Sequence, residues 1–159
     1  MKNRKQQLVI EQMDKKLTVF QSVENVIVPS KGWLNAVRVS LKMTLQQLGN
    51  RLNITPQSAN DLEMREAMGT ITLNRLREAA NALDMKLVYG IIPKDGSIEL
   101  MIEKRAKELA QKIVLRTSNS MKLEDQENSK ERINQAIAEL TEEIKREMPN
   151  TLWDYGNAL

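Results

Sequence analysis

Three polar residues that could do chemistry lie close together in the sequence: Gln57, Asn60 and Asp61. An amide both donates and accepts hydrogen bonds and a carboxylate only accepts, so these side chains suit the recognition of base edges in nucleic acid. The chain contains no histidine and no cysteine. The commonest general base, the commonest metal ligand and any thiol nucleophile are therefore missing, and there is no glycine-rich phosphate loop. We expect a binding protein with no metal and no cofactor, and not an enzyme.

These polar side chains need a rigid element, and Pro56 indicates where it begins. Proline inside a helix costs about 3 kcal/mol, but at the first helical position it loses nothing, because that N–H has no partner within the helix. Thr55 can cap such a helix with its hydroxyl. The 3.6-residue period then gives two faces. The inward face holds Ala59, Leu62 and Glu66, and the outward face holds Gln57, Asn60, Asp61 and Met64.

A second short helix is predicted directly before it. Thr44 precedes "LQQLGNRL", whose leucines recur at helical spacing. Only three residues separate the two helices, and Asn53 tolerates the left-handed conformation of a sharp helix stop. Gly49 has no side chain and allows close approach of the second helix. The pair predicts a helix-turn-helix, although two ordinary packed helices of an all-α protein would give a similar pattern.

Flanking helices complete the predicted core. "GWLNAVRVSLKM" places Leu34, Val37 and Leu41 on one face, and Thr72 caps "LNRLREAANAL". The fold class is therefore mainly all-α, with a four- to five-helix core. "KLVYGIIP" is rich in β-branched and aromatic residues and predicts one short strand at about 86–92. With no other strand in the chain to join, we expect this strand to pair with its copy in a homodimer.

The rest of the chain predicts further helices. We expect one helix over residues 1–25, with a stripe of Val9, Met13, Leu17 and Phe20, and a linker at 28–32. A helix capped by Ser97 runs to about 116 and breaks at "SNS", and a last helix covers 129–147. The expected parts are residues 1–32 as N-terminal helix and linker, 33–93 as DNA-binding domain with dimerising strand, and 94–159 as C-terminal helical region.

Residues at the start of a second helix in a helix-turn-helix meet bases in the major groove. Gln57 suits adenine, and Asp61 suits the cytosine amino group. Ser58 and Thr55 can reach phosphate. For each residue taken alone, a solvated surface is the alternative. The predicted DNA-binding set is Lys42, Arg51, Thr55, Gln57, Ser58, Asn60, Asp61, Met64 and Arg65.

Charge limits what one copy can do. Residues 33–92 hold seven basic and five acidic side chains, a net charge of +2. Because phosphate neutralisation supplies much of the affinity for duplex DNA, one copy should bind weakly, and two copies on a palindromic operator would double the contacts. The segment 98–116 adds five basic and three acidic residues, for which a solvated face is preferred over a second phosphate surface.

Residues 44–63 resemble the helix-turn-helix of the Cro/phage-repressor (XRE-like) superfamily. The matching elements are Leu48, the small residue at 49, the apolar residue at 54, Thr55, and Glu63 after Leu62. The superfamily usually has alanine where this chain has Gly49 and glycine where it has Asn53. The resemblance implies that Glu63 is a buried structural carboxylate that bonds backbone or a nearby arginine, with Arg38 as a candidate partner.

A resemblance over most of the chain is to the bacterial family called mobile mystery protein A. It is carried by "GWLNAVRVSLKMTLQQLGNRL", "GTITLNRLREAANALDMKLVYGIIPK", "SMKLEDQ" and "LWD". The resemblance implies that the chain carries this helix-turn-helix and is encoded beside a Fic-domain protein. The leading hypothesis is a dimeric, sequence-specific repressor of its own operon. The alternative is an antitoxin-like module that binds and restrains the Fic protein. A Fic-inhibitory motif ends in Gly or Asn, and the nearest string here, "SMKLED" at 120–125, ends in Asp.

No apolar run reaches the length of a membrane span, and the start "MKNRKQQLVIEQMDKKL" lacks the apolar core of a signal peptide. We therefore expect a cytoplasmic protein.

Overall fold

The computed structural model describes residues 2–121 and 129–156, and these are mainly helical. The chain divides into two compact units, one built from residues 1–22 and 91–159 and the other from residues 23–90. This division differs from the three expected parts, because the N-terminal helix groups with the C-terminal region. No helix in the described residues is both long enough and apolar enough to cross a membrane.

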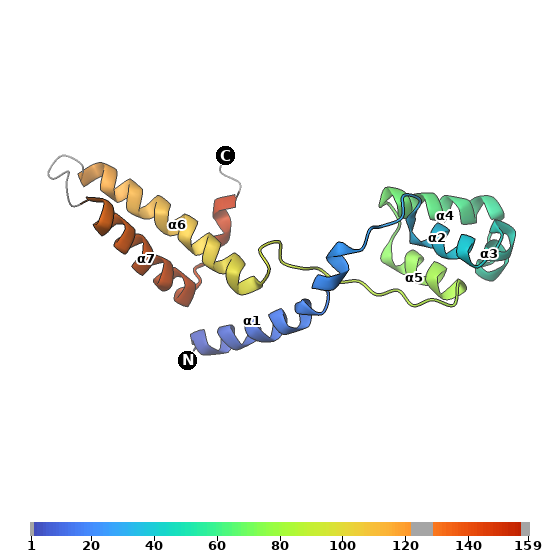
Figure 1. Ribbon diagram of the computed structural model, residues 1–159, viewed down its shortest axis with the longest axis horizontal. Helices are drawn as coiled ribbons and strands as arrows, with labels where there is room; N and C mark the ends of the chain where they lie inside the picture. The colour runs from blue at the N-terminus through green and yellow to red at the C-terminus, as the bar shows by residue number, and fades with distance from the viewer. Residues whose placement is uncertain (1, 122–128, 157–159) are drawn as a thin grey trace. The chain divides into compact units, whose positions relative to one another are not determined.

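The unit of residues 23–90 is a cluster of four helices (Figure 1). They are α2 (Gly32–Ser40), α3 (Leu45–Leu52), α4 (Pro56–Met68) and α5 (Leu73–Ala82). All four helices contribute to one core, and Leu83 closes it. The buried members of this core are Leu34, Leu48, Ala59, Ala79 and Leu83.

Threonine side chains fix where three of these helices begin. The Thr44 hydroxyl accepts from the backbone N–H of Gln47 at 3.1 Å, and the Gln47 side chain accepts from the Thr44 N–H at 2.8 Å, which completes a capping box. Thr55 caps α4 with Pro56 as its first residue, and Thr72 caps α5. The three helix starts predicted from these threonines are confirmed.

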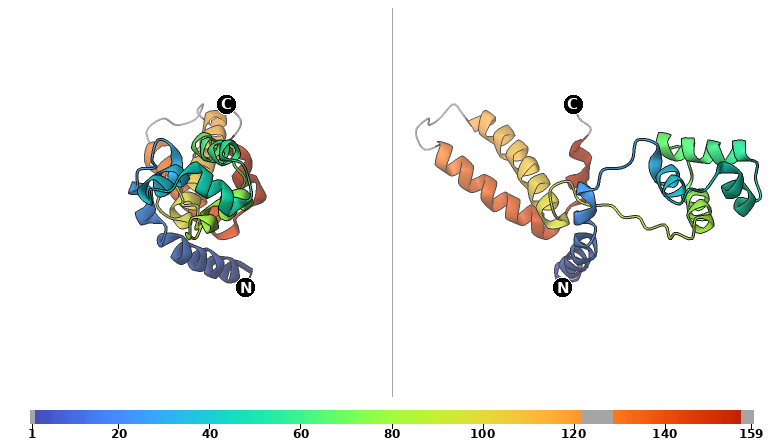
Figure 2. Two further views of the ribbon diagram at one scale, coloured as in Figure 1. Left: turned by 90° about the vertical axis from the view of Figure 1, so that its right-hand side faces the viewer. Right: turned by 45° about the vertical axis from the view of Figure 1, so that its right-hand side comes forward.

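The other unit is built around a pair of long helices. α6 (Ile98–Met121) and α7 (Ser129–Glu147) lie side by side, as the views in Figures 1 and 2 agree. The unit also contains α1 (Lys2–Thr18) and the 3-10 helix η2 (Asn150–Gly156), while the 3-10 helix η1 (Gln21–Asn25) spans the boundary between the units. Its buried core is Ile102, Ala106, Leu109, Ala110, Ile144 and Leu152.

Asp14 joins α1 to the start of α6. Its carboxylate accepts from the backbone N–H of Ile98 at 2.7 Å and of Glu99 at 3.2 Å. The first N–H groups of a helix lack partners within it, so α1 supplies a cap in addition to Ser97, which accepts from Leu100 at 3.0 Å.

Two predicted helix ends are wrong. The N-terminal helix ends at Thr18 instead of 25, where the Thr18 hydroxyl donates back to the Asp14 carbonyl and Phe20 closes a tight turn on Leu17. α6 continues through "SNS" to Met121. Serine and asparagine are only weak helix formers and, unlike proline, do not remove a backbone donor, so they do not stop a helix by themselves.

The predicted strand at 86–92 is absent from the described residues, which contain no strand at all. Residues 85–93 instead form a connection without regular secondary structure. The prediction invoked pairing with a second chain, and a single chain provides no such partner.

Candidate nucleic-acid interface

Helix α4 has two distinct faces. Ala59, Leu62 and Glu63 are buried, and Glu66 is half-buried. The outward residues are all exposed, as the 3.6-residue period predicts: Gln57, Ser58, Asn60, Asp61, Met64 and Arg65. The structure therefore brings the predicted base-contacting and phosphate-contacting residues of α4 to one side of the helix.

The turn between α3 and α4 is tight enough to require glycine at 49. The N–H of Ile54 donates to the Gly49 carbonyl at 2.9 Å, and Asn53 adopts the expected left-handed conformation with φ of 55°. A Cβ atom on Gly49 would lie 2.7 Å from the Ile54 carbonyl oxygen. The close approach predicted from this glycine is present, and it sets the position at which α4 leaves the turn.

A buried ion pair holds the inner face of α4. Arg38 Nε donates to Glu63 Oε1, and Arg38 Nη2 donates to Oε2 at 3.2 Å. The Asn35 amide donates to the same carboxylate at 2.8 Å, and Arg38 also donates to the Met43 carbonyl at 2.8 Å. Glu63 therefore has the buried structural position that the resemblance implied, with Arg38 as its partner.

The hydroxyl of Thr55 caps the first turn of α4. It accepts from the Ser58 N–H at 3.1 Å and donates to the Ser58 hydroxyl at 3.0 Å. Its main role in this structure is therefore to fix the first turn of α4, while Ser58 stays exposed beside it.

The three cations predicted to contact phosphate differ in their surroundings. Arg51 donates to the Ala82 carbonyl at 3.0 Å and to Asp84 at 3.1 Å. Arg65 forms an ion pair with Asp61 at 3.0 Å on the exposed face of α4. Lys42 is exposed in the turn between α2 and α3. An exposed ion pair contributes only about 0–1 kcal/mol to stability. Breaking the pair so that Arg65 and Asp61 can each bind another partner therefore costs little.

The sequence did not indicate the role of Glu66. We expected it only on the inward face, but its carboxylate accepts two backbone N–H groups at the start of α2. The sequence does give one local signal that α2 is capped from elsewhere: α2 begins after Lys31, which provides no side-chain cap.

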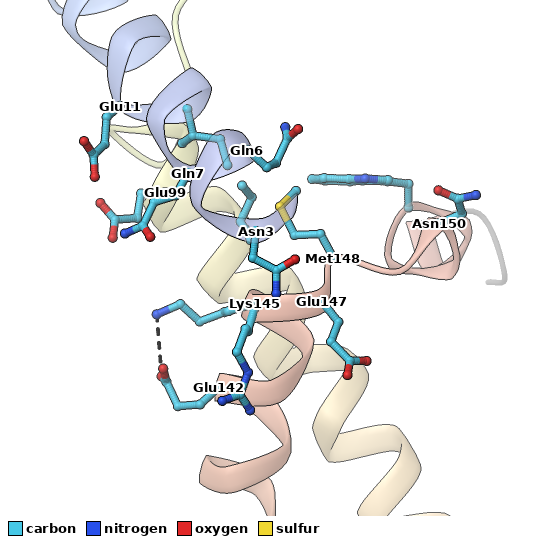
Figure 3. A pocket seen from close by; sticks show the side chains of 14 residues that line it. Asn3, Gln6, Gln7, Glu11, Glu99, Glu142, Lys145, Glu147, Met148 and Asn150 are labelled. Atoms are coloured by element: carbon cyan, nitrogen blue, oxygen red, sulfur yellow. Dashed lines mark ion pairs between the residues drawn. The ribbon is translucent and has the colours of Figure 1, made fainter. Parts of the chain in front are cut away.

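A groove of about 690 Å³ lies in the other unit, between α1, α6, α7 and η2 (Figure 3). Its polar lining combines amides with both signs of charge, including an ion pair between Lys145 and Glu142 at 3.5 Å. Within the described residues there is no group of acidic side chains that could hold a metal ion. The groove shares no residue with the polar face of α4.

No protein-family model, curated protein or solved structure matches the chain.

Proposed function

We propose that this protein is a sequence-specific DNA-binding transcription regulator whose residues 23–90 form an XRE-like helix-turn-helix unit. The observation that carries the proposal is the polar outward face of α4. This face begins in the first turn of α4, and only three residues separate α4 from α3. A helix held from behind by a buried ion pair and exposed along its polar side can enter a major groove without disturbing its own core.

In this proposal some outward residues of α4 contact base edges and others contact the phosphate backbone. Gln57 makes paired hydrogen bonds with adenine, and Asp61 accepts from a cytosine amino group after leaving Arg65. Arg65 then turns to phosphate, together with Lys42 and Ser58. The remaining predicted contacts are Asn60 and Met64 at base edges and Arg51 and Thr55 at the backbone.

The protein acts as a homodimer on a palindromic operator in the cytoplasm. The dimer and the palindromic operator are supported by the small net charge of one unit and by the predicted pairing of residues 86–92. As the resemblance to the mobile mystery protein A family implies, the operon it represses is its own and also encodes a Fic-domain protein.

Footprinting on the DNA upstream of its own gene tests the proposal. Wild-type protein should protect a discrete site, and Gln57→Ala should lose about 1–3 kcal/mol of binding free energy at that site and little on random duplex. Gln111→Ala, which removes an exposed glutamine from α6, is the matched control. If no upstream fragment contains a protected site, the proposal is contradicted. If Gln57→Ala loses the same binding free energy on the site and on random duplex, Gln57 is a phosphate contact.

A second candidate function is restraint of the adjacent Fic protein. It is favoured by the apolar side chains that α1 leaves exposed, Leu8 at 50%, Val9 at 47% and Met13 at 41%. An exposed apolar helix face is typical of a protein-binding surface. The string "SMKLED" lies partly outside the described residues and supports neither function. Footprinting repeated with the Fic protein present separates the two roles.

A further inference from the structure

Glu66 ties α4 to the first turn of α2. Its Oε1 accepts from the Trp33 N–H and its Oε2 from the Leu34 N–H, each at 2.9 Å. The first N–H groups of a helix have no partner within it, and the residue before α2, Lys31, provides no side-chain cap. A carboxylate from the helix with the polar face therefore caps a distant helix, because Trp33 in the first turn of α2 lies 33 residues before Glu66.

Gly32 is matched to this contact. Its φ of +84° is a conformation that side chains disfavour. A Cβ atom at this position would also lie 2.4 Å from Glu66 Oε2 and 3.4 Å from the Ala67 backbone nitrogen. The backbone conformation therefore favours glycine, and a side chain here would fit only if the Glu66 carboxylate moved away from it.

Glu66 is the second of two anchors on the inner face of α4. Glu63, three residues earlier, bonds Asn35 and Arg38 further along α2. Two anchors on successive turns resist rotation of the helix about its axis more strongly than one anchor does. At the radius of about 5–6 Å that side chains reach, a rotation of roughly 20° moves their ends by about 2 Å. A hydrogen bond to a base edge does not survive such a displacement.

We propose that Glu66 is a positioning residue for base recognition: it fixes the rotation of α4 so that Gln57 and Asp61 meet the base edges. This inference rests on the proposed function. Glu66 itself faces away from the DNA and contacts only the protein. Its loss therefore impairs sequence discrimination and leaves phosphate contacts, which tolerate a displaced helix, in place.

The test compares Glu66→Ala and the nearly isosteric Glu66→Gln on two duplexes of equal length, the footprinted site and a random sequence. Binding is measured by fluorescence anisotropy at one fixed salt concentration, because affinity for DNA depends strongly on salt. Glu66→Ala should lose on the order of tenfold in affinity for the site, the effect of one good base contact, and less than about twofold on random DNA. Glu66→Gln keeps one acceptor and should fall between Glu66→Ala and wild type.

Two further variants separate positioning from charge and from general destabilisation. Glu78→Ala removes a carboxylate from the exposed surface of the same unit, and it should leave the ratio of specific to random affinity unchanged. Gly32→Ala disturbs the same contact from the α2 side. It should lower the ratio as Glu66→Ala does, and the double variant should lose little more than either single one, because both act on one contact.

A folded Glu66→Ala variant that keeps its specific-to-random ratio overturns the positioning role and leaves the proposed function intact. Equal losses on both DNAs also overturn it, because they indicate damage to the whole unit. Wild-type protein that shows no preference for any upstream sequence overturns the proposed function and the inference together.

Discussion

Arg38 and Glu63 form a buried ion pair whose side chains are only 12% and 4% exposed. Removing one partner of such a pair leaves a charge without compensation and typically costs about 3–5 kcal/mol. Arg38→Met should therefore lower the free energy of unfolding by several kcal/mol, measured by urea denaturation. Arg75 offers a control, since its pair with Glu78 is largely exposed and Arg75→Met should cost about 1 kcal/mol or less. Similar losses from the two variants would contradict the structural role given to Glu63.

The start of α4 makes a second prediction at the scale of single residues. Pro56→Ala should keep the fold and cost about 0.4–1 kcal/mol, mainly because the unfolded chain becomes less rigid. Thr55→Ala should cost more, up to about 2 kcal/mol, because the Ser58 N–H loses its acceptor. Thermal melts of the two variants give the order of stability. A proline variant that melts well below the threonine variant is incompatible with a helix that starts at Pro56.

Residues whose partners are close in sequence could be predicted, and residues with distant partners could not. The caps at Thr44, Thr55 and Thr72 each bond a backbone N–H three residues later, so the local pattern was sufficient. Glu66 bonds residues 32 and 33 positions away. Periodicity placed it on the inward face but carried no information about what it would meet there. Glu63 was anticipated only because of the superfamily resemblance.

At the scale of elements, the α3–α4 turn depends on Gly49. Alanine normally stabilises a helix interior by roughly 1 kcal/mol over glycine. Here its Cβ would lie 2.7 Å from the Ile54 carbonyl oxygen, which is backbone and cannot turn away. Gly49→Ala should therefore destabilise the protein by about 1–3 kcal/mol, the usual cost of overpacking.

Asn50→Ala provides the control for Gly49→Ala, since it is the next position of the same helix and is exposed. Its change in unfolding free energy should be within about 0.5 kcal/mol of wild type. Urea denaturation of both variants, with circular dichroism as the signal, decides the matter. A Gly49→Ala protein as stable as wild type would mean that the turn can open by enough to accept a methyl group.

The helices were more predictable than their ends. The apolar spacing of α2 to α5 and of α7 gave their positions closely, because each buries one face against a core. The end of α1 at Thr18 and the continuation of α6 to Met121 were missed. The end of α1 carries no glycine or proline signal, and the Thr18 hydroxyl donates there to the Asp14 carbonyl.

At the scale of the whole molecule, α1 belongs to the unit formed by the C-terminal helices. Its Asp14 caps α6 across 84 and 85 positions of sequence, and Ile10 packs against the α6–α7 core. By contrast, Val9 and Met13, members of the predicted stripe, remain exposed. Val9, Met13 and Leu17 of the stripe lie in α1, whereas Phe20 lies beyond its end. Which members would be covered depended on a partner helix that the local sequence does not reveal.

The segment from 86 to 92 lacks backbone hydrogen bonds within the part of the chain that the structure describes. Val88 is 72% exposed, Tyr89 62% and Ile91 79%. Exposing these apolar side chains to water and leaving the backbone groups unpaired are both unfavourable in a single chain. Antiparallel pairing with another strand pairs the backbone groups and covers side chains. Pairing with the same segment of a second copy uses one sequence for both strands and generates a twofold axis.

The final prediction follows from that pairing. Val88→Pro removes a backbone donor, and Ile91→Asp places a charge among apolar side chains, so each should convert dimers to monomers in analytical ultracentrifugation. Each should also weaken operator binding if the proposed dimer contacts two half-sites about one DNA turn apart. Val39→Asp, which charges an exposed apolar position at the end of α2, should leave the dimer intact. If the chain stays dimeric with both changes at 88 and 91, the interface must be sought in α1 or α7 instead.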